Sequence, residues 1–175
     1  MGAPATNDDG GGPAGPRSVV CRPAATPHEL ERYFAIRARF FVDNQHLFEA
    51  SDVEPIDDDP RTLHVVAICQ PLGEVVGVVR CYPADDGVWY GGRLAVIEAY
   101  RASRMLVGQE LVRTAERLMQ ERNVRVFLGW IQLPTVRFFE HLGWVRLGAP
   151  VDYVGRPHQL MRPEWSEEPV EVPSH

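Results

Sequence analysis

The sequence predicts a mixed α/β domain built on a mostly antiparallel sheet, and three observations lead to that prediction. Two β-branched runs, residues 63–69 and 74–81, flank a Gln-Pro-Leu-Gly turn, as the two strands of a hairpin do. A third run, residues 88–96, follows a second turn rich in Asp and Gly. A helix with apolar residues at spacings of three and four then separates this run from an apolar strand at residues 125–130. A crossover helix makes the strands that it joins parallel, so the sheet should contain one parallel pair.

Length, charge and hydropathy limit the classes of function. The 175 residues suit one domain with a substantial core. Residues 1–17 are expected to be a disordered extension, residues 18–165 the domain and residues 166–175 a flexible acidic tail. The net charge of −6 argues against nucleic-acid binding, and no apolar run is long enough to span a membrane.

Cysteine usage and the N-terminal composition bear on the cellular compartment. The three cysteines, Cys21, Cys69 and Cys81, are odd in number and far apart, so they predict neither a disulfide framework nor a metal site. The N-terminus lacks the pattern of a signal peptide. We therefore expect a cytoplasmic protein without a metal, in which Cys81 is a small buried thiol.

The first elements of the domain can be placed from local signals. Residues 18–22 are predicted to form a strand, and a helix is predicted to begin after Thr26. Thr26 is the expected cap, Pro27 takes the first turn and Glu29 completes the capping box. Seven carboxylates and no arginine follow between Asp43 and Asp59, in a second short helix and a loop. This acidic segment is either a solvated loop or a surface that attracts a cationic amine.

The second half of the chain contains a pattern that suits a phosphate group. A strand ending at residues 94–96 is followed by a loop with Arg101, Ser103 and Arg104, and then by the long helix. The first turn of a helix has N–H groups without intrahelical partners and the positive end of the dipole, so it favours an anion. The two arginines add full charges and forked donors at the same place. A last strand is predicted at residues 158–161, after a Gly155-Arg156-Pro157 turn.

This strand, loop and helix resemble the acetyl-CoA motif of the GNAT superfamily of N-acetyltransferases. The chain has the Leu94-Ala95-Val96 strand, the Tyr100-Arg101 pair and Gly108 before the Leu111-Val112 pair. It departs from the motif in the loop, which is one residue longer and holds Arg104, Met105 or Leu106 where the family has its first glycine. The exact set of amides that contact the pyrophosphate therefore differs from the usual one.

A second motif extends the resemblance toward the C-terminus. Residues 138–144, Phe-Phe-Glu-His-Leu-Gly-Trp, are similar to the short helix and glycine turn that follow the next strand in the superfamily. The second aromatic is often a tyrosine that protonates the leaving thiolate, but Phe139 cannot donate a proton. Gln132 stands where an asparagine commonly reaches the pantetheine arm. The helix that runs into Phe-Phe-Val-Asp-Asn-Gln, followed by acidic sequence, is similar to the branch related to acyl-homoserine-lactone synthases.

The resemblance implies a GNAT-like sheet of six or seven strands, with helices on its faces and a slot for acetyl-CoA between the parallel strands. In it, backbone N–H groups of the strand at residues 94–96 polarise the acyl carbonyl. The residues that it implies for binding acetyl-CoA are Leu94, Ala95, Val96, Arg101, Arg104, Met105, Leu106, Val107, Gly108, Gln132, Phe138 and Phe139.

No motif names the acid and base of the reaction, which must be sought among titratable side chains. His158, His64 and Glu98 are candidates for the general base, and Tyr90 and Tyr153 for the acid. We take His158, Glu98 and Tyr153 as the predicted catalytic residues. The predicted substrate-binding residues are Arg37, Phe41 and Arg93.

Together these observations predict an acetyltransferase that uses acetyl-CoA and acts on the amine of a small molecule. Whether the chain forms a homodimer stays open. One alternative is an acyltransferase like the acyl-homoserine-lactone synthases, with an S-adenosyl substrate. Another is a CoA-binding or partner module without catalysis, in which Phe139 marks lost chemistry.

Overall fold

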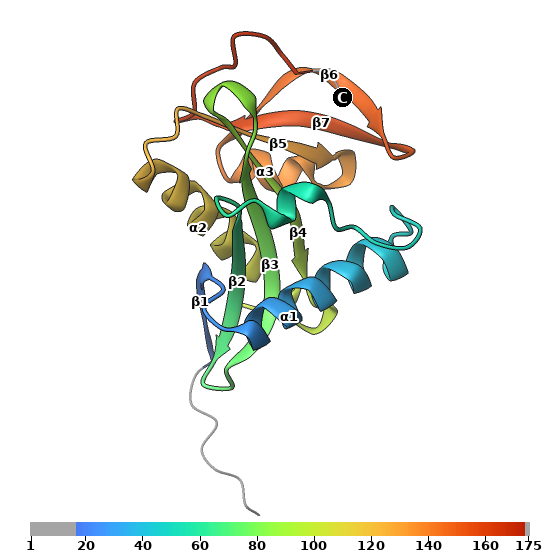
Figure 1. Ribbon diagram of the computed structural model, residues 1–175, viewed down its shortest axis with the longest axis vertical. Helices are drawn as coiled ribbons and strands as arrows, with labels where there is room; N and C mark the ends of the chain where they lie inside the picture. Colours follow the sequence, from blue (N-terminus) through green and yellow to red (C-terminus); the bar gives the residue numbers. More distant parts are fainter. Residues whose placement is uncertain (1–16, 174–175) are drawn as a thin grey trace, which may run out of the picture.

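A computed structural model describes residues 17–173, and Figure 1 shows a sheet with helices packed on both of its faces. The sheet has seven strands in the order β1-β2-β3-β4-β5-β7-β6. The strands are β1 Ser18–Pro23, β2 Leu63–Gln70, β3 Glu74–Pro83, β4 Val88–Val96, β5 Val126–Gln132, β6 Trp144–Tyr153 and β7 Arg156–Pro163. The main helices are α1 Pro27–Arg37, α2 Val107–Glu121 and α3 Val136–His141. The expected N-terminal extension lies outside the described residues, apart from Arg17.

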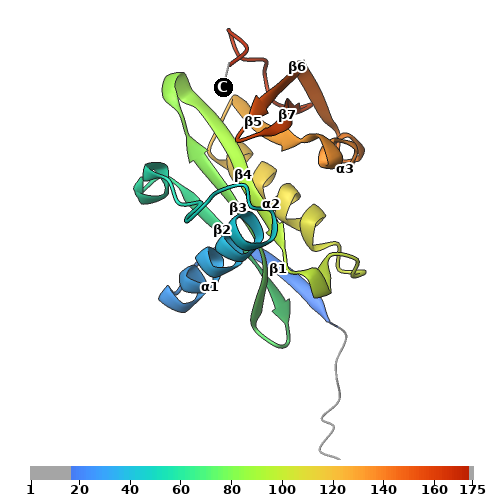
Figure 2. The same ribbon diagram turned by 90° about the vertical axis from the view of Figure 1, so that its right-hand side faces the viewer.

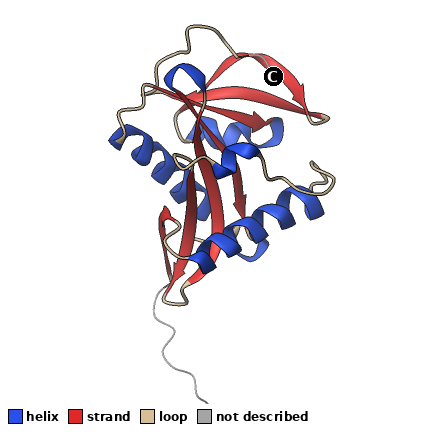
Figure 3. Cartoon of the chain, viewed as in Figure 1, coloured by secondary structure: helices blue, strands red, loops and turns tan. Residues whose placement is uncertain are grey.

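The strand pairing confirms the predicted mixed sheet. Strands β2, β3 and β4 form an antiparallel meander, and β4 pairs with β5 in parallel. The other neighbours in the sheet are antiparallel. Helix α2 is the crossover between the two parallel strands. The sheet continues beyond β5 with β7 and then β6, and Figure 3 shows all the strands in red with the helices in blue around them.

Strand β6 was not predicted from the sequence. Its ladder with β7 is interrupted between Leu147 and Val151, where Gly148 and Pro150 lie, so the alternation of apolar residues is broken. The turn that joins the two strands consists of Val154 and Gly155, which both have positive φ angles. The predicted Gly155-Arg156-Pro157 turn is therefore wrong, since Arg156 and Pro157 already belong to β7.

Helix α1 begins as predicted and then continues further than predicted. The Thr26 side chain accepts a hydrogen bond from the Glu29 N–H, and the Glu29 carboxylate accepts one from the Ala25 N–H at 2.6 Å. After Arg37 the chain does not break but continues as a π-helix, Ala38–Asn44. Wide turns of this kind often occur at functional sites. This one carries Phe40 and Phe41 to the edge of the cavity described below.

The two main helices cover opposite faces of the sheet, as Figure 2 shows for α1 and α2 on either side of β3. The predicted apolar stripe of α2, Val107, Leu111, Ala115 and Leu118, is buried against strands β2 and β3. Gly77 of β3 permits this close packing, because a Cβ atom there would lie 2.9 Å from the Leu111 Cδ1 atom. The other face buries Tyr33, Ile36 and neighbouring residues under α1.

The first residues of the C-terminal segment form hydrogen bonds with the sheet. This corrects the expectation of a free tail that begins at Ser166. The Ser166 hydroxyl is buried and accepts a hydrogen bond from the Phe127 N–H at 2.8 Å. The Glu167 N–H donates to the Arg125 carbonyl. The Trp165 indole N–H donates to the buried Glu116 carboxylate, which also accepts from Trp144. Among residues 17–173 no helix combines the length and apolarity needed to cross a bilayer.

Candidate functional site

A cavity of about 390 Å³ lies where the two parallel strands part. Their ladder runs from Val88 and Val126 to Gly91 and Gly129 and stops there. Beyond this point β4 remains paired with β3, and β5 remains paired with β7. The facing edges of β4 and β5 therefore have no strand partner, and residues 92–94 and 130–132 line the cavity. The predicted slot between the parallel strands is present.

The β4 edge of the cavity contains a β-bulge at Arg93. Arg80 pairs with Gly92 and Val78 pairs with Ala95, so both Arg93 and Leu94 lie opposite Val79. Arg93 has a φ angle of 55°, which few residues other than glycine adopt. Bulges re-aim side chains near functional sites. Here the bulge brings the Arg93 guanidinium to the Asp52 and Glu54 carboxylates, at 3.2 Å from each.

Arg93 belongs to a network of three arginines and three carboxylates, which we call the ion-pair network and which is buried except for the half-exposed Glu54. Its other arginines are Arg37 and Arg80. Arg37 contacts Asp52 and Asp57 at 2.7 Å each, and Arg80 contacts Asp57 at 3.1 Å and Glu54 at 2.6 Å. The members are Arg37, Arg80, Arg93, Asp52, Glu54 and Asp57. Its formal charges therefore cancel.

For Asp52 and Asp57 the ion-pair network contradicts both expectations for the acidic segment, whereas Asp43, Glu49 and Asp58 are exposed, as a solvated loop predicts. Asp52 and Asp57 are neither solvated nor free to attract an amine, because both are buried and held by arginines. Burial raises the pKa of Asp57, but the hydrogen bonds from Arg37 and the Glu54 N–H and the charge of Arg80 outweigh it and hold that pKa well below its usual range. Arg37 has a side-chain exposure of 0%, so the prediction that it binds substrate is wrong. Phe41 and Arg93 do line the cavity.

His158 and Tyr153 meet at the cavity wall formed by β7 and β6. Their rings pack edge to face, with centroids 5.3 Å apart, and both line the cavity. The Nδ1 atom of His158 lies 2.9 Å from the Arg156 carbonyl. A carbonyl only accepts hydrogen bonds, so Nδ1 carries the proton and Nε2 keeps a lone pair in the neutral ring. Burial lowers the pKa of His158; its hydrogen bond to the Arg156 carbonyl opposes this shift, and the charges of Arg156 and Arg93 add to it.

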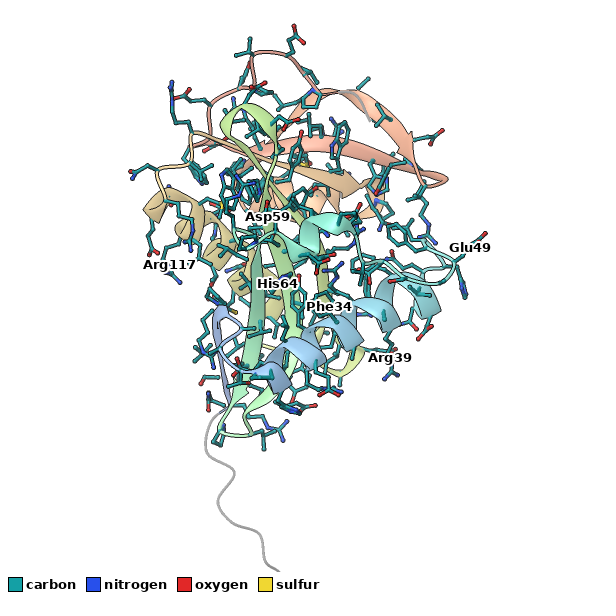
Figure 4. The ribbon with its side chains drawn as sticks, viewed as in Figure 1. Phe34, Arg39, Glu49, Asp59, His64 and Arg117 are labelled. Carbon is teal, nitrogen blue, oxygen red and sulfur yellow. The ribbon has the colours of Figure 1, made fainter. Side chains whose placement is uncertain are left out.

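The other acid and base candidates, Glu98, His64 and Tyr90, do not line this cavity. Glu98 is exposed and lines a second, open hollow of about 640 Å³ together with Arg32, Arg39 and Arg101. The structure therefore does not bring Glu98 to the parted strands with His158. His64 packs beside Phe34 where α1 crosses β2, as Figure 4 shows, and its Nε2 lies 3.2 Å from the Asp57 carbonyl. Tyr90 stacks on Tyr82 with centroids 5.7 Å apart.

The loop before α2 presents free donors at the cavity side of the sheet. Leu106 starts the helix with a φ angle of 51°, and no side chain caps the first turn. Arg104 is exposed and makes no ion pair among the residues that the structure describes. Arg101 is more constrained, because its Nε donates to the Val96 carbonyl at 3.0 Å and its guanidinium lies over the Phe40 ring. Met105 packs against the main core, whereas Leu106 is exposed.

The second motif forms the opposite wall of the cavity. Phe139 is buried against Trp144 with ring centroids 5.1 Å apart, whereas Phe138 is 37% exposed. Both line the cavity. The Gln132 amide N–H donates to the Gln45 side-chain oxygen at 2.9 Å, and the Gln45 carbonyl accepts a hydrogen bond from Arg156. Neither Gln45 nor Arg156 was predicted. Arg156 could have been found if the turn had been placed at residues 154–155, since it then shares a strand face with His158.

The parted parallel strands and the uncapped helix define the acyltransferase fold that the sequence motifs predict. A family model described as Acetyltransferase (GNAT) family matches residues 29–144, and the chain therefore belongs to this family. No curated protein matches the chain in sequence.

Three solved structures illustrate the likeness in fold. An acyl-CoA N-acyltransferase from Pseudomonas aeruginosa has a TM-score of 0.69 and 20% identity, over 85% of this chain and 99% of the other. Escherichia coli ElaA has a TM-score of 0.71 and 20% identity over the same shares. BjaI, a CoA-dependent acyl-homoserine lactone synthase solved with SAM and isopentyl-CoA, has a TM-score of 0.65 and 18% identity, over 83% of this chain and 82% of the other.

Proposed function

We propose that the protein transfers an acyl group from an acyl-CoA, with acetyl-CoA as the simplest donor, to the amine of a small molecule. The observation that carries this proposal is the cavity between the parted strands, which has His158 on its wall and lies near the uncapped start of α2. The free amides of α2 and the Arg104 side chain would hold the pyrophosphate. The unpaired edges of β4 and β5 would hold the pantetheine arm.

The described residues suit the requirements of the reaction. Acyl transfer needs fixed donors at the carbonyl, a neutral amine and a path for the leaving thiolate. Backbone N–H groups on the free β4 edge would polarise the carbonyl. His158, neutral and with its lone pair on Nε2, would accept the proton of the attacking amine. Tyr153 lines the same cavity and is the proposed acid, since Phe139 has no proton to give.

The assignment of the pyrophosphate site predicts opposite effects of Gly108→Ala on stability and on binding. A Cβ atom at Gly108 would meet Phe138 at 3.6 Å and Val96 at 3.8 Å, which are ordinary contacts. Alanine should therefore be tolerated and should stabilise the helix by up to about 1 kcal/mol. The added methyl group would keep a phosphate from the helix amides, so we expect the Kd for acetyl-CoA to rise about 10-fold or more. Thermal melting and calorimetric titration would test both effects.

Charge reversal at the same site offers an independent test. Arg104→Glu places a carboxylate where the pyrophosphate would bind, so the Kd for acetyl-CoA should rise about 10-fold or more. Arg117→Glu is the matched control, because Arg117 lies on the outer side of α2 in Figure 4 and, among residues 17–173, forms an ion pair only with Glu121. Equal Kd values for both variants would show that the loop before α2 does not bind the cofactor.

A product assay would separate the proposed function from its two alternatives. The protein would be incubated with acetyl-CoA and a mixture of amines, and products would be identified by mass spectrometry. Acylated amines are the expected result. Acyl-homoserine lactone formed from SAM would favour the synthase-like alternative. Binding of acetyl-CoA without any product would favour a module without catalysis.

A further inference from the structure

We infer that the amine acceptor carries a carboxylate, as an amino acid does, and that Arg156 is the residue that binds this carboxylate. The inference rests on the proposed function and names the class of its acceptor. It follows from the charges on the cavity wall, the position of Arg156 and its distance from His158.

The cavity wall contains one carboxylate, and that carboxylate is already engaged. Among the described residues that line the cavity, Glu54 is the only acidic one. Its Oε2 atom accepts hydrogen bonds from Arg80 at 2.6 Å and Arg93 at 3.2 Å. The Glu54 carboxylate is 40% exposed, but two arginines already share its charge. This wall therefore does not favour a polycationic amine.

Among the described residues, Arg156 is the cation on the cavity wall for which no carboxylate partner is found. Arg80 and Arg93 belong to the ion-pair network, in which three carboxylates neutralise three arginines. Arg156 is partly buried and contacts no carboxylate in the part of the chain that the structure describes. Its one hydrogen bond there goes to the Gln45 carbonyl, which leaves most of its five N–H donors free. A guanidinium held this way matches a carboxylate in shape and charge.

The distance between Arg156 and His158 suits an amine and a carboxylate on one small molecule. Arg156 and His158 are two positions apart in β7, so their side chains point to the same face of the strand. Their Cα atoms are about 7 Å apart in such a strand. Both side chains line the cavity. An amino acid could therefore place its carboxylate at Arg156 and its amine at His158. The Gln45 carbonyl holds the guanidinium in place, and Gln132 holds the Gln45 side chain.

The test compares amino acids with their carboxamides, in which a neutral amide of similar size replaces the carboxylate. Initial rates with acetyl-CoA would be measured for glycine and glycinamide, and for each further pair of an amino acid and its amide. We expect kcat/KM to be about 10-fold or more higher for the acids, because a charge-assisted hydrogen bond discriminates by that factor. Arg156→Gln should abolish the preference, and Arg156→Lys should keep part of it. Arg146→Gln is the matched control, since Arg146 pairs with Glu140 outside the cavity.

A binding measurement makes the test independent of turnover. Saturation-transfer NMR with CoA present would compare N-acetylglycine with N-acetylglycinamide on the wild type and on Arg156→Gln, with thermal melting to confirm that the variant is folded. Preferential binding of the acid that is lost in Arg156→Gln supports the inference. Acylation of amines without any preference for the acid, or a preference that survives Arg156→Gln, overturns the inference alone. Acetyl-CoA binding without transfer to any amine overturns the proposed function, and the inference with it.

Discussion

Replacing His158 with glutamine is expected to lower kcat/KM for acyl transfer about 100-fold or more and to leave the Kd for acetyl-CoA nearly unchanged. A positioned general base contributes roughly 10²- to 10⁴-fold. Glutamine is similar in size and can still donate to the Arg156 carbonyl, which His158 Nδ1 contacts at 2.9 Å. What it lacks is the basic lone pair that the neutral histidine has on Nε2.

The pH dependence gives this prediction a signature that a packing defect would not reproduce. The neutral ring is the active form, and burial together with the nearby arginine charges lowers the pKa of His158 below 6.5. The rate, expressed per concentration of neutral amine, should therefore fall as the pH drops through this lowered pKa and should be flat above it. His158→Gln should lose this acidic limb. His141→Gln is the matched control, because His141 makes the same Nδ1 contact with a carbonyl, that of Arg137, on the surface. An acidic limb that persists in His158→Gln would rule out His158 as the base.

The parts of the fold and site that depend on residues close together in the sequence were predictable. Strand β4 was predicted with its observed ends, and the Thr26–Glu29 cap was predicted with its observed hydrogen bond. The apolar stripe identified α2 as a helix packed on the sheet, and a crossover helix makes β4 and β5 parallel neighbours. The cavity lies where these two strands part. Such features follow from periodicity, turn chemistry and the handedness of crossovers, which all act over short stretches of chain.

The ion-pair network could not be predicted because it joins residues that are far apart in the chain. Asp52 lies 15 residues from Arg37 and 41 residues from Arg93 in sequence. The acidic segment contains no arginine of its own, so its composition resembled that of a solvated loop. Only the tertiary fold brings α1, β3 and the β4 bulge around it. Carboxylates that look unpaired in sequence are therefore poor indicators of a cation site, because distant arginines can neutralise them.

Glu98 was wrongly assigned to the site and Arg156 was missed, and in both cases the reason is the position of a strand boundary. Glu98 follows β4 directly, but the strand ends at Val96 and the next turn directs the chain away from the cavity. Arg156 was assigned to a turn, whereas the turn ends at Gly155 and Arg156 starts β7. A shift of one or two residues is within the usual error of predicted element ends. For a strand, such a shift decides which side chains share a face.

Asp57→Ala is expected to destabilise the protein by roughly 3–5 kcal/mol, because it removes one partner from a buried set of ion pairs. Removing Asp57 takes away the carboxylate that Arg37 and Arg80 share, at 2.7 Å and 3.1 Å. Arg37 keeps Asp52 and Arg80 keeps Glu54, but three arginines then face only two carboxylates. The uncompensated positive charge is costly because it has lost its hydration. Asp58→Ala is the control: Asp58 is exposed, so its loss should change the free energy of unfolding by less than about 0.5 kcal/mol. Urea denaturation followed by circular dichroism would measure both.

Asp57 also makes the stability of the protein depend on pH, and the lowered pKa of Asp57 gives the direction of this dependence. The Asp57 pKa lies well below the value of about 3.9 expected for an unfolded chain. The stabilisation by Asp57 is therefore fully present above pH 4 and is lost only as the pH falls from there toward the pKa of the folded state. Wild-type stability should decline steeply below pH 4, and Asp57→Ala should show a smaller decline from its lower starting value. If the two proteins lose stability in parallel between pH 4 and pH 2, Asp57 does not hold the network together, and the burial of Arg37 must depend on Asp52 alone.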